Sequence, residues 1–532
     1  MISDTVRKYV RFAWFLPGFL LWAAFPPMGE KTDVLFALAP LLWVSRQRDP
    51  RTSARRWFAS GVVYWVATLS WMPAIVKNGG PWPLVVLGWF ALAAYCAGYF
   101  ALFGYLSAQV WRWVRGGGWW RRLFAVLVAE PVLWCGLELL RSRLFGGFAW
   151  NQLGVVPANG GFAAPAALGG VYLLSAVVIL VNGTVAGIVE RVRREAPRWA
   201  GVETLLSFGV VVAAYWASSF VSPPGLGDGE FKVALVQRNF PCVFKGREDN
   251  PYEVYDRLLS GVAPLKPDLV VLPESGLCEF GPADQQGSVR FANWVREKTG
   301  AELLAGGTRF CDGREFNSAA LYSRGGDISI YDKVHLVPFG EFIPGDKWIT
   351  SLQKLAPVGS CTPGELKTLA LVPGADGSSL GVAICFEDTD SAQMRRLANM
   401  GAGLLVFITN DSWFSNSVEA EQHAWQATAR AVETGLTAVR VGNNGVTGTI
   451  TPDGRASWLL DADGRPLVDR QGSMMDRVRV VPAQGDNGGW RGYTTPYAAL
   501  GDWPLGVTFA LLILAMILVK YTRYGKYRSV SV

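Results

Sequence analysis

Three residues that could carry acyl-transfer chemistry each lie at or near the end of a short apolar run. Glu274 follows the run at 270–273, Lys333 lies within 331–341, and Cys385 ends the run at 380–385. Acyl transfer needs a thiolate nucleophile, a base that generates it and a cation that stabilises the oxyanion. We therefore predict that Cys385 is the nucleophile, that Glu274 takes its proton and that Lys333 stabilises the tetrahedral oxygen. The backbone N–H of Phe386 is a candidate second donor.

Each of these residues, taken alone, has a more ordinary interpretation. A glutamate after a strand is commonly a solvated loop residue, and a lysine in an apolar run commonly extends its ammonium group to water. A cysteine that ends an apolar strand is commonly a small buried hydrophobic residue. The three together favour the catalytic interpretation, because they supply a complete set of groups for one reaction.

The elements that must position these residues are the strands of an α/β domain at about 230–500. Short β-rich apolar runs separated by turn residues predict strands, and a helical pattern covers 419–434. Strand ends bring side chains that are distant in sequence to one rim of a sheet. The predicted strands are 231–237, 268–272, 301–305, 318–322, 328–331, 380–385 and 404–409.

The rest of the chain has the composition of a membrane protein. Half of all residues are hydrophobic and only 17% are charged, which lies outside the usual soluble range. Basic clusters flank the apolar runs and all fall on one side if the chain has eight spans, so the positive-inside rule places both termini in the cytoplasm and residues 222–502 outside. The predicted spans are 12–25, 33–45, 58–75, 82–108, 123–139, 165–189, 202–221 and 503–520.

Longer motifs around the three residues resemble the apolipoprotein N-acyltransferase family of the nitrilase superfamily. In chain order they are Pro273–Glu274, the run YDKVHLVPFGE at 331–341 and the run ICFE at 384–387. The family often has Tyr where this chain has Phe386. Further matches are FNS at 316–318, TNDSWF at 409–414, Arg440 with NNGVT at 443–447, and the loop GGFAWNQLG at 146–154.

The resemblance implies a polytopic α-helical membrane domain of about eight spans that carries an α/β nitrilase-like αββα sandwich. The parts would be seven membrane helices at 1–221, an extracytoplasmic catalytic domain at 222–502, and an eighth transmembrane helix with a cytoplasmic tail at 503–532. It implies that Glu341 and Glu387 orient Lys333 and the thiol. Asn317, Trp413 and Arg440 fall in matching motifs and would support the site.

The resemblance also implies the reaction and its partners. An acyl chain would pass from a phospholipid, through a Cys385 thioester, to the α-amine of a diacylglyceryl-cysteine apolipoprotein, in a ping-pong mechanism that completes lipoprotein maturation. The catalytic domain would face the periplasm from the bacterial inner membrane, and no cofactor is implied. The alternative is a membrane-tethered nitrilase-type amidase that hydrolyses a C–N bond with water. A non-catalytic scaffold is disfavoured, because all three site residues are present.

Other kinds of partner are disfavoured by the sequence. Much of the net charge of +7 lies in short basic clusters beside apolar runs, and no nucleic-acid-binding motif is present, so we expect no nucleic-acid partner. The chain has two histidines, no CxxC pair and no HExxH motif, so we expect no metal site. We predict a structural role for His335 and a place on the face of the 419–434 helix for His423.

Two sets of polar residues allow more than one interpretation. Glu130 and Glu138 lie in or near a predicted span, and Glu138 is spaced to pair with Arg141 one turn later; we favour a structural pair over a functional intramembrane carboxylate. Outside the cytoplasm, disulfides could form between four cysteines. The sequence does not show which of the three possible pairings forms, or whether all four cysteines remain free. These are Cys242, Cys278, Cys311 and Cys361.

Overall fold

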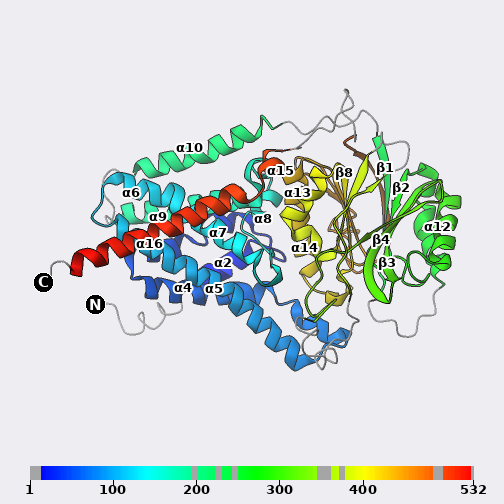
Figure 1. The fold of residues 1–532 in the computed structure, drawn as a ribbon, viewed down its shortest axis with the longest axis horizontal. Coiled ribbons are helices and arrows are strands. Elements are labelled where there is room, and N and C mark those ends of the chain that lie inside the picture. The colour runs from blue at the N-terminus through cyan, green and yellow to red at the C-terminus, as the bar shows by residue number, and fades with distance from the viewer. Residues whose placement is uncertain are drawn as a thin grey trace. The chain divides into compact units, whose positions relative to one another are not determined.

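The computed structural model describes residues 14–193, 201–221, 230–241, 250–343, 361–370, 378–482 and 495–528. The chain divides into two compact units (Figure 1). A helical unit contains Met1–Ser70, Val86–Phe220 and Leu500–Val532, and a mixed unit contains Trp71–Val85 and Val221–Ala499. The short segment Trp71–Val85 therefore folds with the second unit, although along the chain it lies between two stretches of the first.

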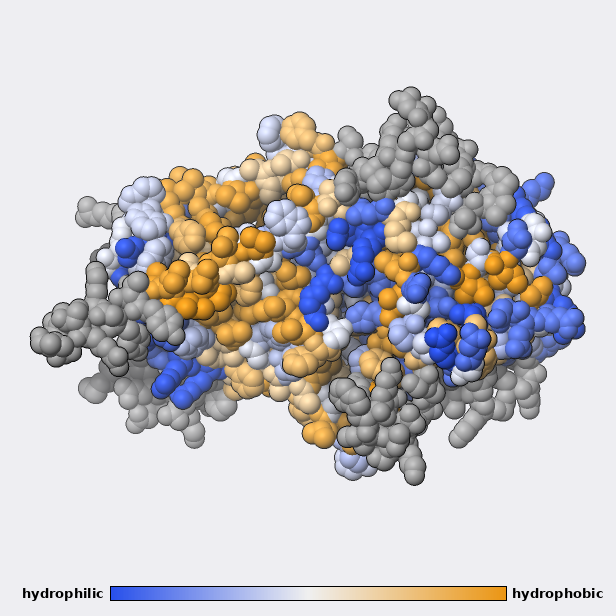
Figure 2. Space-filling view, in the orientation of Figure 1, coloured by the Kyte–Doolittle hydropathy of each residue, from blue (hydrophilic) through white to orange (hydrophobic). Residues whose placement is uncertain are grey.

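The helical unit has the surface expected of a protein in lipid. Its outward side chains include large apolar ones, such as Leu205 and Phe208, which are 74% and 70% exposed. Figure 2 shows hydrophobic side chains gathered over this unit, as suits helices that face lipid instead of water. Its elements are α2 (Leu16–Ala23), η1 (Lys31–Leu35), α3 (Ala39–Gln47), α4 (Pro50–Thr68), α5 (Trp82–Val114), α6 (Trp119–Phe124), η3 (Ala125–Ala129), α7 (Glu130–Arg141), η4 (Leu144–Gly146), α8 (Val155–Asn159), α9 (Ala166–Val192), α10 (Gly201–Ser218) and α16 (Trp503–Arg528).

Six helices among the described residues are long and apolar enough to cross a membrane, fewer than the eight predicted spans. The span predicted at 33–45 is divided between η1 and α3. Pro40, in the first turn of α3, has no N–H to continue a preceding helix, and the Leu38 N–H donates instead to Asn182 Oδ1 at 2.8 Å. The span predicted at 12–25 begins outside the described residues, and its described part is the short helix α2.

The predicted pair between Glu138 and Arg141 is wrong. Glu138 Oε1 accepts hydrogen bonds from Trp134 Nε1 and from the Leu153 N–H, each at 2.9 Å. Arg141 donates to the carbonyl of Trp150 at 2.8 Å. Both side chains therefore hold the loop at 146–154 against the end of α7, through hydrogen bonds to its backbone groups.

The mixed unit is a four-layer αββα sandwich. One sheet has the order β12-β1-β2-β3-β4-β5 and the other the order β11-β10-β9-β8-β7-β6, with parallel pairing at β1–β2–β3 and at β7–β8–β9. The strands are β1 (Glu230–Gln237), β2 (Leu269–Val271), β3 (Glu302–Cys311), β4 (Arg314–Tyr322), β5 (Ile328–Asp332), β6 (Leu369–Ala370), β7 (Ser379–Ile384), β8 (Ala402–Thr409), β9 (Ala438–Gly442), β10 (Gly448–Ile450), β11 (Ala456–Trp458) and β12 (Gly472–Arg479).

The layers follow from the alternation of side chains along each strand. On β2, Leu269 and Val271 pack into the core between the sheets, whereas Val270 packs beneath the outer helices α11 (Pro251–Ser260) and α12 (Gln286–Thr299). On the other sheet, α13 (Ser391–Asn399) and α14 (Glu419–Thr434) cover the outer face. Burial of both faces explains why these strands are nearly continuous apolar runs. The remaining elements are η2 (Met72–Asn78), η6 (Ala263–Leu265), η8 (Cys385–Thr389), η9 (Asp411–Phe414) and α15 (Pro496–Leu500).

Candidate active site

Glu274 lies in a tight turn that follows β2. The turn is fastened to β3 through Gly306, whose N–H donates to Pro273 O at 3.1 Å and whose carbonyl accepts from the Leu277 N–H at 2.9 Å. A Cβ on Gly306 would lie 2.2 Å from Glu274 O. Only glycine therefore allows the turn to approach the strand this closely, and the strand positions the glutamate.

Lys333 lies just after β5, and its ammonium group meets two carboxylates. Lys333 Nζ is 2.9 Å from Glu341 Oε1 and 3.8 Å from Glu274 Oε1. Asn317 on β4 donates from Nδ2 to both carboxylates, at 2.7 Å to Glu274 and 2.6 Å to Glu341. Four of the predicted site residues thus form one contiguous polar group, in which the lysine is only 1% exposed.

The environment separates the two carboxyl groups in pKa. Burial raises the pKa of Glu274, with Lys333 opposing and Glu341 adding to the rise. Burial also acts on Glu341, but Lys333 and the Val337 N–H outweigh it and lower the pKa of Glu341. Neighbouring carboxylates with divergent pKa values divide acid–base work between them. Glu341 is thus the permanent partner of Lys333, and Glu274 is suited to exchange protons.

Cys385 is the first residue after β7 and begins η8. Its φ of +55° is left-handed, which is rare for a residue with a side chain. Burial raises the pKa of the thiol well above its ordinary value, Glu274 raises it further, and Lys333 lowers it. The resting group is therefore a thiol, and it needs a base before it can attack.

Glu387 joins the loop of Lys333 to the turn of Cys385. Its fully buried carboxylate accepts the backbone N–H groups of Val334 at 2.8 Å, His335 at 3.0 Å and Ile384 at 2.8 Å. The Tyr331 hydroxyl donates to the same group at 2.9 Å. Since Ile384 precedes Cys385 and Val334 follows Lys333, one carboxylate fixes the two loops relative to each other.

The other predicted supporting residues lie farther from this group. Phe386 packs edge-on against the His335 ring, with centroids 5.9 Å apart, instead of presenting a hydroxyl. Trp413 lies in η9, where its carbonyl accepts Asn78 Nδ2 at 2.9 Å. Arg440, fully buried on β9, pairs with Asp388 and lies 3.6 Å from Asp411. In the described residues Cys278, Cys311 and Cys361 are free, and Cys242 lies outside them.

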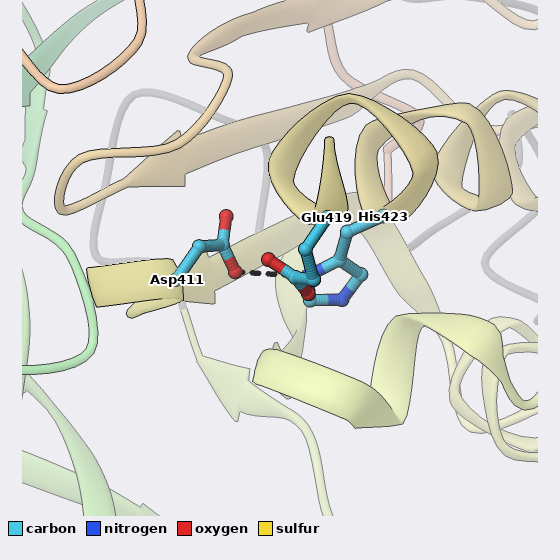
Figure 3. Close-up of side chains that lie close together, drawn as sticks. All are labelled: Asp411, Glu419 and His423. Carbon is cyan, nitrogen blue, oxygen red and sulfur yellow. Dashed lines mark hydrogen bonds and ion pairs between the residues drawn. The ribbon is translucent and has the colours of Figure 1, made fainter. Parts of the chain in front are cut away.

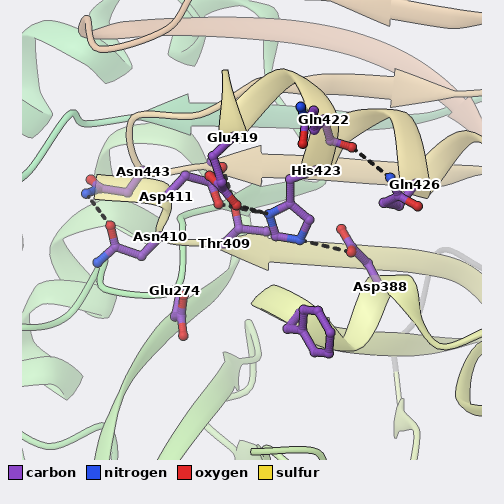
Figure 4. A network of polar contacts seen from close by, with 12 residues as sticks. Glu274, Asp388, Thr409, Asn410, Asp411, Glu419, Gln422, His423, Gln426 and Asn443 are labelled. Atoms are coloured by element: carbon purple, nitrogen blue, oxygen red, sulfur yellow. Dashed lines mark hydrogen bonds and ion pairs between the residues drawn. The ribbon is translucent and has the colours of Figure 1, made fainter. Parts of the chain in front are cut away.

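Sequence reasoning missed a second buried polar network, which includes Asp388 of η8 (Figure 4). His423 lies on the 419–434 helix, as predicted, and its Nδ1 lies 2.9 Å from Asp411 Oδ1 and its Nε2 3.0 Å from Asp388 Oδ1. The TNDSWF motif contained Asp411, but nothing in the sequence joined it to His423, twelve residues later. Its partners come from separate segments, which only the fold brings together.

Asp411, Glu419 and His423 also have the composition of a metal site, since one ligand atom from each lies within 4.8 Å of the others (Figure 3). Both ring nitrogens of His423 already face carboxylates, and the Arg440 guanidinium lies beside Asp411. Burial and then Asp411 raise the pKa of Glu419 well above its ordinary value. With Glu419 neutral, the charges of His423 and Arg440 balance those of Asp388 and Asp411. This balance favours a protonated imidazole over a divalent ion at this position.

Comparison with known proteins follows the same division into two units. Residues 17–184 match the family model of the apolipoprotein N-acyltransferase N-terminal domain, and residues 232–476 match that of carbon-nitrogen hydrolases. The apolipoprotein N-acyltransferase of Geobacter metallireducens is 33% identical over 82% of this chain and 84% of its own length. That of Photobacterium profundum is 27% identical over 97% and 98%. A crystal structure of an amidase from Nesterenkonia sp. has 18% identity and a TM-score of 0.35 over 48% of this chain and 93% of its own, too distant to carry an argument.

Proposed function

This chain belongs to the apolipoprotein N-acyltransferase family, and on that premise we propose that it moves an acyl chain from a phospholipid to the α-amine of a diacylglyceryl-cysteine lipoprotein. The observation that carries the proposal is the group formed by Glu274, Lys333 and Glu341 around Asn317, beside the strained Cys385. It supplies a base, a cation and a nucleophile at the ends of three strands. The alternative of a small-amide hydrolase is not favoured, because the relatives matched over both units are named as N-acyltransferases.

In the first half-reaction Glu274 accepts the Sγ proton and Cys385 attacks the ester carbonyl of the donor. The new C–S bond places negative charge on the carbonyl oxygen, which the Lys333 ammonium and the Phe386 N–H stabilise. The C–O bond to glycerol then breaks. The departing lysophospholipid oxygen takes the proton from Glu274, and the acyl chain remains as a Cys385 thioester.

In the second half-reaction the lipoprotein amine attacks the thioester carbonyl. Glu274 takes a proton from the attacking nitrogen, the C–S bond breaks, and the sulfur recovers a proton as the amide forms. Lys333 serves both tetrahedral intermediates, because Glu341 and Asn317 keep it in place throughout. The structure of the site thus suits two successive acyl transfers with no other reactant.

The chain is a membrane protein by its apolar helices and its family. We propose that it lies in the bacterial inner membrane with both termini in the cytoplasm and the catalytic domain, 222–502, in the periplasm, between the membrane helices of 1–221 and the one at 503–532. The distribution of basic residues supports this orientation. Reporter fusions at 225 and at the C-terminus test it: alkaline phosphatase is expected to be active only at 225.

The experiment that tests the mechanism is isolation of the acyl-enzyme. The detergent-purified protein is incubated with phospholipid carrying a labelled acyl chain, and the adduct is digested with and without hydroxylamine. We expect a hydroxylamine-sensitive label whose mass maps to the peptide of Cys385. Cys385→Ser is expected to abolish that label, and Cys311→Ser, a free cysteine at the end of β3, to retain it.

A hydroxylamine-sensitive label that persists in Cys385→Ser would sink the nucleophile assignment. The class of reaction is tested separately by adding a synthetic diacylglyceryl-cysteinyl peptide to the labelled enzyme. Transfer of the label to the peptide amine is the expected outcome. Turnover of small amides without such transfer would instead identify a hydrolase.

A further inference from the structure

We propose that His423 is a positioning residue for the nucleophile, a buried imidazolium that joins Asp388 in the turn of Cys385 to Asp411 in the loop after β8. The proposal rests on the proposed function, in which Cys385 attacks. It adds a residue that touches neither substrate nor the sulfur and acts through the two loops that flank them.

The contacts of His423 reach two separate elements. The residue lies on α14 and is 1% exposed. Its Nε2 is 3.0 Å from Asp388 Oδ1, and its Nδ1 is 2.9 Å from Asp411 Oδ1 and 3.6 Å from Glu419 Oε1. A neutral imidazole can donate from only one nitrogen, so a ring with a carboxylate at each nitrogen is best served when both are protonated.

The first element carries the nucleophile. Asp388 lies three residues after Cys385 in the short helix η8 and is fully buried. The Thr389 hydroxyl in the same turn donates to Phe386 O at 2.8 Å. A shift of Asp388 would therefore move the turn that holds Cys385 in its left-handed conformation, because the turn has little freedom to absorb it.

The second element reaches the base. Asn410, next to Asp411, donates from Nδ2 to Ser275 Oγ at 2.7 Å, and Ser275 follows Glu274. Asn443 fixes Asn410 from the other side, with Nδ2 to Oδ1 at 2.9 Å. A chain of contacts thus runs from the turn of Cys385 to Ser275, beside the proposed base. It passes in order through Asp388, His423, Asp411 and Asn410. His423 contacts both loops, with one ring nitrogen at hydrogen-bond distance from each carboxylate, and Arg440 contacts the same two carboxylates from β9.

The charges around His423 agree with this geometry. Burial lowers the pKa of His423, and Arg440 lowers it further, but Asp388 and Asp411 outweigh both and raise it to about 10. The groups that face the ring are Asp388 from η8, Asp411 from η9, Glu419 from α14 and Arg440 from β9. Loss of the imidazolium would leave two carboxylates against the single charge of Arg440. Since Asp411 already raises the pKa of Cys385, that imbalance would raise the thiol pKa further.

The test compares Cys385 reactivity in the full-length parent and in His423→Gln, which keeps the size but not the charge. The rate of alkylation of Cys385 by iodoacetamide is followed by mass spectrometry from pH 6 to pH 10. We expect the limiting rate to fall on the order of 10–100-fold and its midpoint to move to higher pH. The kcat of acyl transfer should fall in parallel, with KM for the phospholipid within about twofold.

A second variant perturbs the same bridge without changing a charge. A Cβ on Gly445 would lie 1.9 Å from Asp411 Oδ2, so Gly445→Ala displaces that carboxylate from His423. We expect a lower limiting rate of alkylation with little change in its midpoint. Glu421→Gln, which removes an exposed charge from the same helix, is the control and should match the parent.

The outcomes separate the inference from the proposed function. A parent that forms no acyl adduct contradicts the function itself. A parent that forms the adduct while His423→Gln and Gly445→Ala keep parent-like alkylation profiles and kcat contradicts only the positioning role. Stoichiometric bound metal in the purified parent, lost in His423→Gln, would also overturn it, because the ring would then be a ligand instead of an imidazolium.

Discussion

At the scale of single residues, the site depends on which carboxylate holds Lys333. Glu341 holds it at 2.9 Å, while Glu274 remains at 3.8 Å with a raised pKa. In Glu341→Gln the lysine loses its ionised partner and turns toward Glu274, and the like charge that raises the Glu274 pKa disappears. Both changes lower the pKa of Glu274. We therefore expect the acidic limb of kcat/KM to move to lower pH and kcat to fall by roughly 10–100-fold.

The measurement is the pH–rate profile of acyl transfer to a diacylglyceryl-cysteinyl peptide, for the parent and the variant. Glu297→Gln, at an exposed position on α12, is the matched control and should leave the profile unchanged. An acidic limb that stays in place or moves to higher pH would mean that Glu274 is not the group that titrates.

Residue chemistry was predictable where one residue type implies one role. Glu274, Lys333 and Cys385 were predicted from strand ends and from the groups that acyl transfer needs, and Glu341 and Glu387 from the family motif; their catalytic roles stay predictions, while the fold brings Glu274, Lys333 and Glu341 together. His423 was not found, because the helical pattern around it shows only a residue on one helix face. Its partners Asp388 and Asp411 come from two other elements, and no local pattern states that three segments meet.

At the scale of elements, the turn of Glu274 requires the glycine at 306 on β3. A Cβ at that position would overlap Glu274 O at 2.2 Å, and backbone on both sides cannot move away cheaply. We expect Gly306→Ala to lower stability by about 1–3 kcal/mol and to lower kcat more than tenfold by displacing the base (~1 Å costs about 10²-fold). Activity and thermal melting in detergent check both effects.

The control for this prediction is Gly261→Ala, at the end of α11. Nothing lies within 4 Å of a Cβ there, so stability and kcat should match the parent. Equal effects of the two substitutions would show that the lower stability and kcat of Gly306→Ala come from replacing a glycine as such, not from the close approach of the turn to β3.

The packing of α14 gives the mixed unit a predictable dependence on pH. The pKa of His423 is raised from 6.5 to about 10 in the fold. A raised pKa means that the ion pairs stabilise fully below pH 6.5 and that their contribution is lost as pH rises through 10. His423→Gln should therefore cost about 3 kcal/mol near pH 6 and progressively less toward pH 10.

Melting curves of the parent and the variant at several pH values measure this difference. Groups distant from His423 titrate alike in both proteins, so their effects cancel when the two are subtracted. A difference that is constant from pH 6 to pH 10 would show that His423 is not charged in the folded protein.

Elements were predictable where the hydrophobic pattern is strong. The seven predicted strands correspond to β1, β2, β3, β4, β5, β7 and β8, and the helix at 419–434 is α14. The strands β6 and β9 to β12 were missed: β6 has two residues and β10 and β11 three each, too few to display an alternation, and β12 is only half buried. The span predicted at 33–45 failed because its apolar length concealed Pro40 and the bond of Leu38 to Asn182.

At the scale of the whole molecule, the segment Trp71–Val85 connects two kinds of structure. It follows α4 along the chain and ends in the first turn of α5, yet it belongs to the compact unit that contains the candidate active site. Trp71 packs edge-on against Phe414 at 4.7 Å between centroids and donates to Gln422 on α14 at 3.3 Å. Hydropathy had assigned residues up to 75 to a span, because Trp, Met, Pro and Ile suit a lipid interface and a protein interface equally.

Asn78 is the contact through which this segment acts on the site. Its Nδ2 donates to Ser412 O at 3.3 Å and to Trp413 O at 2.9 Å, and these carbonyls belong to η9, directly after Asn410 and Asp411. Asn78→Ala leaves both carbonyls without that donor. The loss lowers the free energy of unfolding by about 1 kcal/mol for each hydrogen bond. We expect faster amide hydrogen exchange in 411–414 and a severalfold lower kcat, whereas Lys77→Ala, at the exposed neighbouring position, should change neither. If exchange in 411–414 accelerates while kcat is unchanged, η9 is held for stability alone and the membrane-derived segment does not contribute to catalysis.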